Sequence, residues 1–454
     1  MAVMSSEQSP PVTRPVREVL TPPVRRLLLG MIGNALGGGL VLSLLIVYLH
    51  DVRGMSTAVA GLVLSWMAVL SLLVAPLAGM VIDRIGPRRV LMGALVVEAV
   101  GVFLYGQVVD TKGAFLAATL AGIGGAGLWP SQTSLVAALA PPEDRQQVFG
   151  LQFMLLNLGL GLGGLLGAVV IDTSRPGTFV VLYTAAAASY LGYLVAVATL
   201  RGYGGPVPPE APGDTGSDTG SDNGSDADDD TAGRQGSGGY REVLADRRVR
   251  RLIVASLVMT TCGYGSLEAG VPAFTTQVAG LSEKVIGVVF FVNTAVIVAA
   301  QLLVLRRIEG RSRARLLALV GVLWAGCWLL VGASALVPPA AAVVALMMGA
   351  AVFAVGETLW SPVQPALLND LAPPHLRGRY NAVSSVVWNV GAAIGPLLVG
   401  VLLAAGLAVV WVALVVVGCL GAGAIALGLR HLLTPEQDGR VPAVALPAVG
   451  GSAP

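Results

Sequence analysis

Three acidic side chains lie inside long apolar stretches of this sequence, namely Glu98, Glu268 and Glu357. A charge at membrane depth is expensive, so an ionisable group there is a functional candidate by default. An apolar environment favours the neutral carboxylic acid, and such a group can bind and release a proton as its surroundings change. These residues could therefore couple proton movement to another process. A structural hydrogen bond is the alternative role for each.

Aromatic and amide side chains accompany two of these acids. Tyr264 precedes Glu268 by one helical turn, and Trp360 and Gln364 share the helix face of Glu357. The same kind of pair recurs in an earlier apolar stretch, and one amide falls in the first stretch. The candidates for a binding site, besides the two acids, are Asn34, Trp129, Gln132, Tyr264, Trp360 and Gln364.

Aromatic walls with a few amides and two acids suit an amphipathic guest that is neutral or cationic. Ordinary helix packing is the alternative, and it accounts for any one of these residues more easily than for the group. No Lys or Arg falls in the middle of an apolar stretch. A carrier of phosphates or dicarboxylates needs buried positive charge to replace the hydration of its substrate, so that class is disfavoured.

The composition is that of a membrane protein. Of 454 residues, 55% are hydrophobic and 12% are charged, whereas soluble domains carry about 25% charged residues. Mean hydropathy is +0.78. We predict an all-α membrane protein with twelve transmembrane helices, each of about 20 residues. The predicted spans are 27–49, 55–82, 89–109, 113–140, 147–171, 178–200, 252–279, 283–305, 314–336, 339–371, 379–404 and 406–430.

Positive charge is distributed unevenly across the predicted membrane. Of the 28 Lys and Arg residues, only Arg53, Lys112, Arg175 and Lys284 fall on one side. Because cytoplasmic loops carry the excess of positive charge, both termini are expected in the cytoplasm of a multi-pass protein of the cell membrane.

The two halves of the chain repeat each other. Gly124 and Gly356 are 232 positions apart, and the same spacing relates Pro130 to Pro362 and a run of further residues through the next span. An ungapped repeat of this length predicts two pseudo-symmetric six-helix bundles that arose by duplication. Glycines four apart, such as Gly159 and Gly163, predict close helix packing, which we expect to smooth the contacts of bundles that rock.

A short turn between the second and third spans carries a distinctive pattern. Its residues are Gly79, Asp83, Arg84, Gly86, Arg88 and Arg89, with a Pro inserted before the arginine pair. This pattern resembles the signature loop of the major facilitator superfamily, G-x-x-x-D-R-x-G-R-R. The resemblance implies that this turn is a cytoplasmic latch between the two bundles. The turn after span 8 keeps the basic residues and lacks the Asp.

The superfamily resemblance also implies a central cavity lined by spans 1, 4, 7 and 10. Glu268 and Glu357 would lie on cavity helices, and Glu98 would lie on a peripheral one. Within the superfamily the chain resembles the drug:proton antiporter branch. It departs from that branch on span 5, where Gly163 is followed by Gly rather than Pro, and early in span 4, where an Arg is missing.

An acidic, Gly- and Ser-rich linker separates the bundles. Its composition is typical of a solvated tether, and a short basic amphipathic helix follows from Tyr240. We divide the chain into an N-terminal segment 1–26, a bundle 27–200, a linker 201–251, a second bundle 252–430 and a tail 431–454.

The sequence and the resemblance together predict a proton-coupled secondary transporter that exports small amphipathic compounds, such as drugs or secondary metabolites, by alternating access. The alternative is an importer of a neutral solute such as a sugar or nucleoside. No phosphate-binding G-x-x-x-x-G-K-[ST] motif and no catalytic set occurs, so neither an ATP-driven pump nor an enzyme is expected. We expect a monomer that meets a small-molecule substrate, protons and the lipid bilayer, with no metal, cofactor or nucleic acid.

Overall fold

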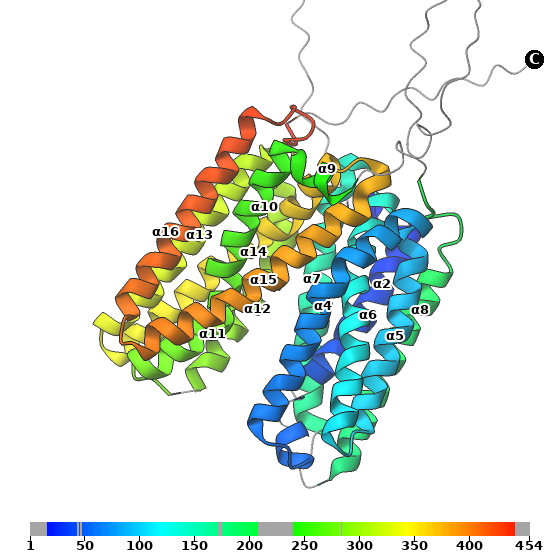
Figure 1. Cartoon of the computed structure of the whole chain (residues 1–454). Helices are drawn as coiled ribbons and strands as arrows, with labels where there is room; N and C mark the ends of the chain where they lie inside the picture. Colours follow the sequence, from blue (N-terminus) through cyan, green and yellow to red (C-terminus); the bar gives the residue numbers. More distant parts are fainter. Residues whose placement is uncertain are drawn as a thin grey trace, which may run out of the picture.

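The computed structural model describes residues 16–42, 45, 48–170, 175–207, 239–282 and 284–440 (Figure 1). Within them, eleven helical segments are long and apolar enough to cross a membrane. Helix α2 (Pro22–Leu42), followed by the π-helical turn η1 (Tyr48–Val52), takes the place of the first predicted span. The predicted twelve-helix, all-α architecture is confirmed.

The first bundle continues from α2 through five long helices. Their starts follow from local sequence: Ser56 and Asp110 accept backbone N–H groups at two N-termini, and Pro87 and Pro176 open two others. The helices are α4 (Thr57–Ile85), α5 (Pro87–Gly106), α6 (Thr111–Leu139), α7 (Pro142–Val170) and α8 (Pro176–Ala198).

The second bundle begins with α9 (Tyr240–Ala245), the short helix predicted to lead into span 7. Span 7 itself starts at Arg247 rather than at 252, because Asp246 caps it. It runs as α10 (Arg247–Met259), the π-turn η2 (Thr260–Gly265), α11 (Ser266–Ala273) and the π-turn η3 (Phe274–Val278). The remaining elements are α12 (Lys284–Ile308), α13 (Arg313–Ala333), α14 (Pro339–Leu371), α15 (Arg377–Ala404), α16 (Ala408–Gly428) and the 3₁₀ turns η4 (Ser334–Leu336), η5 (Pro374–Leu376) and η6 (Leu429–His431).

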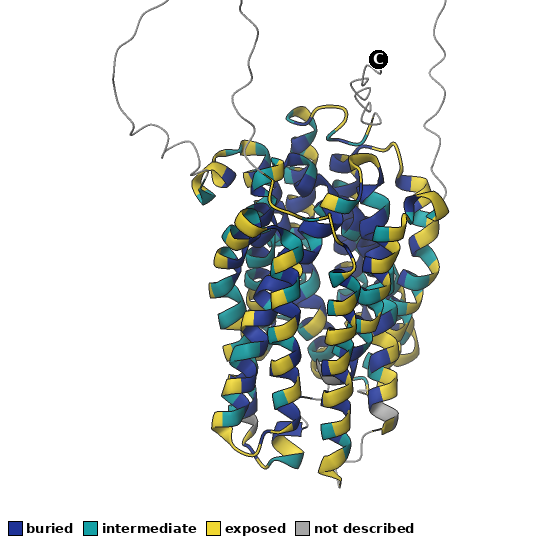
Figure 2. Cartoon of the chain, turned by 90° about the vertical axis from the view of Figure 1, so that its right-hand side faces the viewer, coloured by how far each residue is buried: buried dark blue, intermediate teal, exposed yellow. Residues whose placement is uncertain are grey.

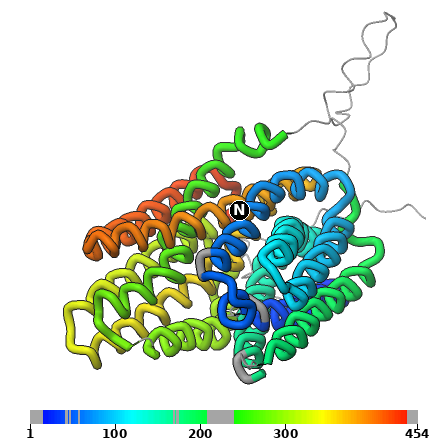
Figure 3. Tube along the Cα trace, turned by 60° about the horizontal axis from the view of Figure 1, so that its bottom comes forward, coloured from blue at the N-terminus to red at the C-terminus, as the bar shows by residue number. Residues whose placement is uncertain are grey.

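The two bundles lie side by side, with the blue-to-cyan half next to the green-to-red half (Figures 1 and 3). Exposed positions occur along the whole length of the helices, not only at their ends (Figure 2). Many are large apolar residues, such as Leu62, Leu73 and Leu77 on α4. Apolar surface along entire helices is what a lipid-embedded protein presents, so the chain is a multi-pass membrane protein.

Among the described residues, the bundles touch mainly through five helix pairs: α4 with α15, α6 with α15, α6 with α14, α7 with α12, and α7 with α14. These contacts gather at the end of the molecule where the chain enters α2 and leaves α16, which we call the terminal face. Towards the opposite end the bundles lean apart (Figure 1). The structure therefore holds its two halves together towards the terminal face.

The acidic repeat of the predicted linker lies outside the described residues. The start of the linker, however, packs on the turn between α4 and α5. Gly86 has φ 90°, and a Cβ there would come within 2.4 Å of the carbonyl oxygen of Gly204. Residues 204–206 therefore pack against the first bundle, although most of 201–207 is exposed.

The glycine ladders pack helices within each bundle and not between the bundles. A Cβ on Gly163 of α7 would lie 2.1 Å from the carbonyl oxygen of Leu36 in α2. On α15, a Cβ on Gly395 would lie 2.6 Å from the Cα of Gly265. The ladders thus make each bundle compact, and the expectation that they smooth the contacts between bundles is wrong.

Replacing Gly163 by Ala should destabilise the protein, because the new methyl group overlaps the α2 backbone. We expect a cost of about 1–3 kcal/mol, measured as a lower midpoint of thermal unfolding in detergent. Gly164→Ala is the matched control, because nothing lies within 4 Å of a Cβ at Gly164. Equal midpoints for the two variants would contradict the packing described here.

Candidate functional site

Glu357 is the most enclosed of the three membrane acids. It lies on α14 with 5% of its surface exposed. Its Oε2 accepts a hydrogen bond from Asn293 Nδ2 of α12 at 2.7 Å, and the Tyr264 hydroxyl of η2 lies within hydrogen-bonding reach. No ion pair reaches it from the described residues. Because its partners are neutral, this carboxyl has no fixed positive charge that would hold it ionised.

Aromatic rings cluster around Tyr264, whose hydroxyl adjoins this carboxyl. The Tyr264 ring lies 4.7 Å from that of Trp388, 5.1 Å from that of Trp324 and 5.8 Å from that of Phe353, centroid to centroid. Trp324 stacks on Phe353 at 4.5 Å and donates Nε1 to the Phe353 carbonyl at 3.1 Å. Trp360 adjoins the same group, 6.0 Å from Trp324. Four spans thus contribute to one aromatic cluster.

The cluster has one open edge and one neighbouring acid. Trp388 on α15 is 43% exposed, unlike the buried Trp324. Glu268 on α11 is exposed and lies close enough for its charge to act on both Glu357 and Tyr264. Of the candidate residues, the structure brings Tyr264, Glu268, Glu357 and Trp360 into one region.

The other predicted binding residues are not part of this group. Trp129 on α6 is 46% exposed, and Asn34 on α2 is half-buried. Gln132 is buried and accepts a hydrogen bond from the Tyr193 hydroxyl at 3.1 Å. Gln364 is buried and contacts Ser384 Oγ at 3.5 Å. Each glutamine thus bonds a residue of its own bundle, which fits ordinary helix packing, the alternative to a binding role.

Glu98 lies in the first bundle, between α5 and α6. Its Oε2 rests against Gly124, where a Cβ would come within 2.6 Å, and it has no hydrogen-bond partner among the described residues. Two tyrosines of the same bundle, Tyr105 and Tyr190, lie near it. The structure thus places an acid with no ion pair from the described residues inside the first bundle, next to the backbone of Gly124 and Gly125.

Four residues of this site were not predicted from the sequence. Asn293 is on span 8, Trp324 on span 9 and Trp388 on span 11, outside the four spans that the resemblance implied, and Phe353 is on span 10. A signal existed for Asn293, which is an amide in the middle of an apolar run. Trp324 and Trp388 occur in sequence contexts that ordinary lipid-facing helices share.

A second group of polar residues lies at the terminal face. Asp83, at the end of α4, has a side chain only 7% exposed. Its Oδ1 accepts from the backbone N–H of Gly378 at 2.6 Å, and its Oδ2 accepts from that of Arg379 at 3.3 Å. Arg379 Nε forms an ion pair with the same carboxylate at 3.6 Å. Asp83 thus holds the N-terminus of α15, which belongs to the other bundle.

The remaining residues of the signature turn have different surroundings. Gly79 allows close contact, since a Cβ there would lie 2.6 Å from that of Ala382. Arg88 donates to the carbonyl groups of Val197 and Ala198 at 3.1 and 2.7 Å, at the C-terminus of α8. Arg84 and Arg89 are exposed. Asp83 and Gly79 therefore face the other bundle, whereas Arg88 secures its own.

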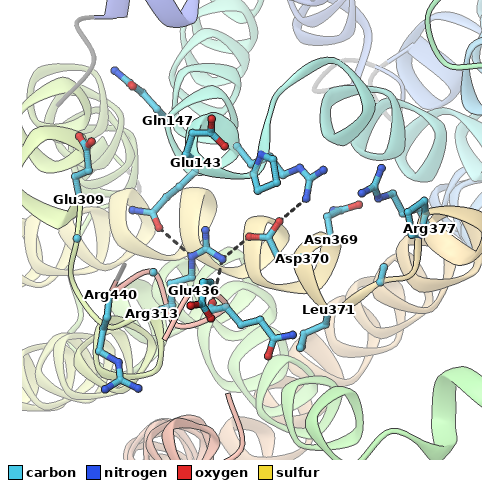
Figure 4. A pocket seen from close by; sticks show the side chains of 18 of the residues that line it. Glu143, Gln147, Glu309, Arg313, Asn369, Asp370, Leu371, Arg377, Glu436 and Arg440 are labelled. Carbon is cyan, nitrogen blue, oxygen red and sulfur yellow. Dashed lines mark hydrogen bonds and ion pairs between the residues drawn. The ribbon is translucent and has the colours of Figure 1, made fainter. Parts of the chain in front are cut away.

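An ionic cluster lies beside this contact, around a pocket of about 510 Å³ that both bundles line (Figure 4). At its centre is Asp370, at the end of α14. Arg145 Nη1 from the first bundle bonds its Oδ1, and Arg313 Nη1 bonds its Oδ2 at 2.6 Å. The Arg145–Asp370 pair crosses between the bundles and helps to close the terminal face.

Sequence comparison finds that the family model described as Major Facilitator Superfamily matches residues 27–361. The chain is 25% identical over 166 residues to the quinolone resistance protein NorA of Staphylococcus aureus. That alignment covers 37% of this chain and 42% of the relative, so it spans less than half of that protein. An uncharacterized MFS-type transporter of Bacillus subtilis, YhjO, is 24% identical over 86% of this chain and 88% of its own length.

Solved structures share the fold. The human organic anion transporter MFSD10 is 20% identical, covers 93% of this chain with 100% of its own, and superimposes with a TM-score of 0.64. A bacterial homologue of the iron transporter ferroportin, in an outward-facing state, is 14% identical, covers 90% of this chain with 99% of its own, and gives a TM-score of 0.72. At these identities the similarity is one of fold alone.

Proposed function

Because the chain belongs to the Major Facilitator Superfamily, we propose that it is a proton-coupled secondary transporter that exports small amphipathic compounds, neutral or cationic, by alternating access. The observation that carries this proposal is Glu357, which is buried against Asn293 and Tyr264 with no ion pair from the described residues. Such a carboxyl can change its protonation as its surroundings change, as an acid locked to an arginine cannot. Glu268, beside it, is the second coupling candidate, and Glu98 is the third.

We propose that the substrate meets the open edge of the aromatic cluster. Trp388 and Tyr264 offer ring faces next to two carboxyl groups, an arrangement that suits a cationic or dipolar amphipathic guest. Trp129 and Asn34 are the candidate contacts from the first bundle. The partial similarity to a quinolone resistance protein supports a drug-like substrate class. Binding of such a guest would favour ionisation of the carboxyl groups, and proton entry would favour its release.

The terminal face is cytoplasmic in this proposal, because Arg84, Arg89 and the other basic turns lie there. With the bundles joined at that face and leaning apart at the other, the structure corresponds to the outward-facing state. Asp83 and the Arg145–Asp370 pair would latch this state and separate when the transporter turns inward. We place the protein in the cell membrane, acting as a monomer.

The direction of transport is tested in vesicles of both orientations. Candidate compounds would first be chosen by ligand-induced melting of the purified protein. The side opposite the terminal face is made acidic in both, which means an acidic lumen in inside-out vesicles and an acidic medium in right-side-out vesicles. We expect this proton gradient to drive uptake into inside-out vesicles and not into right-side-out vesicles. Uptake driven only in right-side-out vesicles would favour the importer of a neutral solute instead.

Trp388→Ala should weaken substrate binding about fivefold to tenfold, because it removes an exposed ring face beside Tyr264. The measurement is equilibrium binding to the purified protein. Trp66→Ala is the control, because Trp66 is similarly exposed, at 42%, but lies on α4 of the other bundle. Equal losses for the two variants would remove the aromatic cluster as the binding site.

A further inference from the structure

The last described residues, up to 440, pack against the second bundle. Residues 434–440, which we call the C-terminal clasp, fold back onto the N-terminus of α13. Asp438 has none of its surface exposed. Its Oδ1 accepts from Ser312 Oγ and from the Ala314 backbone N–H, both at 3.0 Å, and its backbone oxygen accepts from the Arg313 N–H at 2.9 Å. Arg440 adds an ion pair to Oδ2 at 2.8 Å.

These contacts hold Arg313 in place. Arg313 lies next to Asp438 and is 4% exposed. Its Nη1 donates to the Gln437 carbonyl of the clasp at 3.1 Å and to Asp370 of α14 at 2.6 Å. Its Nε donates to Gln146 Oε1 of α7 at 3.3 Å, across the contact between the bundles (Figure 4). One guanidinium therefore joins the clasp, its own bundle and the other bundle.

The internal repeat relates the surroundings of Arg313 in the second bundle to those of Asp83 in the first. In the first bundle, Asp83 reaches across and holds the N-terminus of α15. The turn after α12 is the counterpart of that latch turn, and it has no Asp at the corresponding place. Its end instead provides Arg313, which reaches α7, the counterpart of α15. A buried guanidinium needs its hydrogen-bond acceptors in place, and the clasp supplies one of them.

We propose that the C-terminal clasp is a working part of the gate at the terminal face, in which Asp438 positions Arg313 as the second latch between the bundles. Asp438 touches no residue of the first bundle in the contacts described, so it acts through Arg313. The inference rests on alternating access. Its test needs neither the substrate nor the coupling ion, so it can fail while the proposed transport function holds, and the reverse.

The test is thiol labelling of full-length protein carrying Ser134→Cys, purified in detergent. Ser134 is 2% exposed between α6 and α15, where its Oγ accepts from Asn381 Nδ2 at 3.0 Å. The three native cysteines are buried, and the parent protein gives their background. We expect Asp438→Ala to raise the labelling rate about tenfold by weakening the latch. Asp438→Asn, which keeps an acceptor oxygen for Ser312 and Ala314, should restore most of the slow labelling.

Two further variants make the test specific. Glu436→Ala is the matched control, because this acid lies in the same clasp with its side chain exposed. Arg313→Ala should raise labelling as Asp438→Ala does, and combining the two should add little, because both remove one latch.

The proposal is overturned if Asp438→Ala labels like its parent, if Glu436→Ala labels equally fast, or if the effects of Asp438→Ala and Arg313→Ala add fully. Melting of each variant in detergent is measured alongside. Should Asp438→Ala and Asp438→Asn both fail to give folded protein, the clasp is a folding element and not a gate, which also overturns the proposal.

Discussion

Glu357→Gln is expected to abolish transport driven by a proton gradient while the protein still binds a neutral substrate. Glutamine has the size of glutamic acid and can still accept the hydrogen bond from Asn293 Nδ2, which lies 2.7 Å from the native carboxyl oxygen. The variant therefore preserves the packing around α14 and removes only the exchangeable proton. A cationic substrate should bind more weakly, because the negative charge that would attract it is lost.

The measurement is uptake into vesicles with and without an imposed proton gradient, alongside equilibrium binding. We expect gradient-driven uptake by Glu357→Gln to fall to the level of protein-free vesicles. Glu268→Gln should weaken coupling as well, since its charge acts on Glu357. Glu436→Gln, at an exposed acid outside the membrane spans, is the matched control, and Glu98→Gln is measured as the third candidate. If both Glu357→Gln and Glu268→Gln respond fully to the gradient, the coupling acid lies elsewhere, with Glu98 next.

Asp83→Asn should leave the protein folded and inserted and should reduce transport strongly. The substitution removes the ion pair with Arg379 and the charge that faces the N-terminal N–H groups of α15. Losing a charge at a helix N-terminus and its charged hydrogen bonds costs about 1–2 kcal/mol. That energy stabilises the closed terminal face, so the balance should shift about tenfold towards the inward-facing state.

Two readouts separate this effect from misfolding. Labelling of Ser134→Cys should accelerate in Asp83→Asn, and the unfolding midpoint in detergent should change little. Asp110→Asn is the control, because Asp110 accepts from Gly113 N–H at the start of α6 and has no hydrogen bond or ion pair to the other bundle among the described residues. Unchanged turnover and labelling in Asp83→Asn would show that the signature turn only fixes the orientation of the chain in the membrane and is not a latch.

Much of the fold could be predicted from the sequence. Apolar runs of about 20 residues in a chain with few charges leave little choice but membrane helices, and the repeat fixed their grouping. The signature turn also pointed to a latch at Asp83. Its partners, Gly378 and Arg379, lie far along the chain, and no local pattern links them to Asp83. Only the packing of α4 against α15 reveals them.

The candidate site was predicted less completely, for a similar reason. Helical spacing shows that Gln364 shares a face with Glu357, but it does not show whether that face meets a neighbouring helix. Gln364 meets Ser384, and Gln132 meets Tyr193, so both amides are used in packing. Asn293, in contrast, reaches Glu357 from another helix. Contacts between helices depend on their rotation, which a single sequence does not specify.

The central claim is that substrate and protons move in opposite directions through this protein. The most direct test uses liposomes that contain the purified protein and an internal pH indicator, with no pH gradient at the start. A substrate gradient is imposed, and the internal pH is followed. We predict that substrate leaving the liposome drives protons in, so that the interior acidifies with the parent protein but not with Glu357→Gln. Substrate movement without any pH change, or with protons moving in the same direction, would contradict the account.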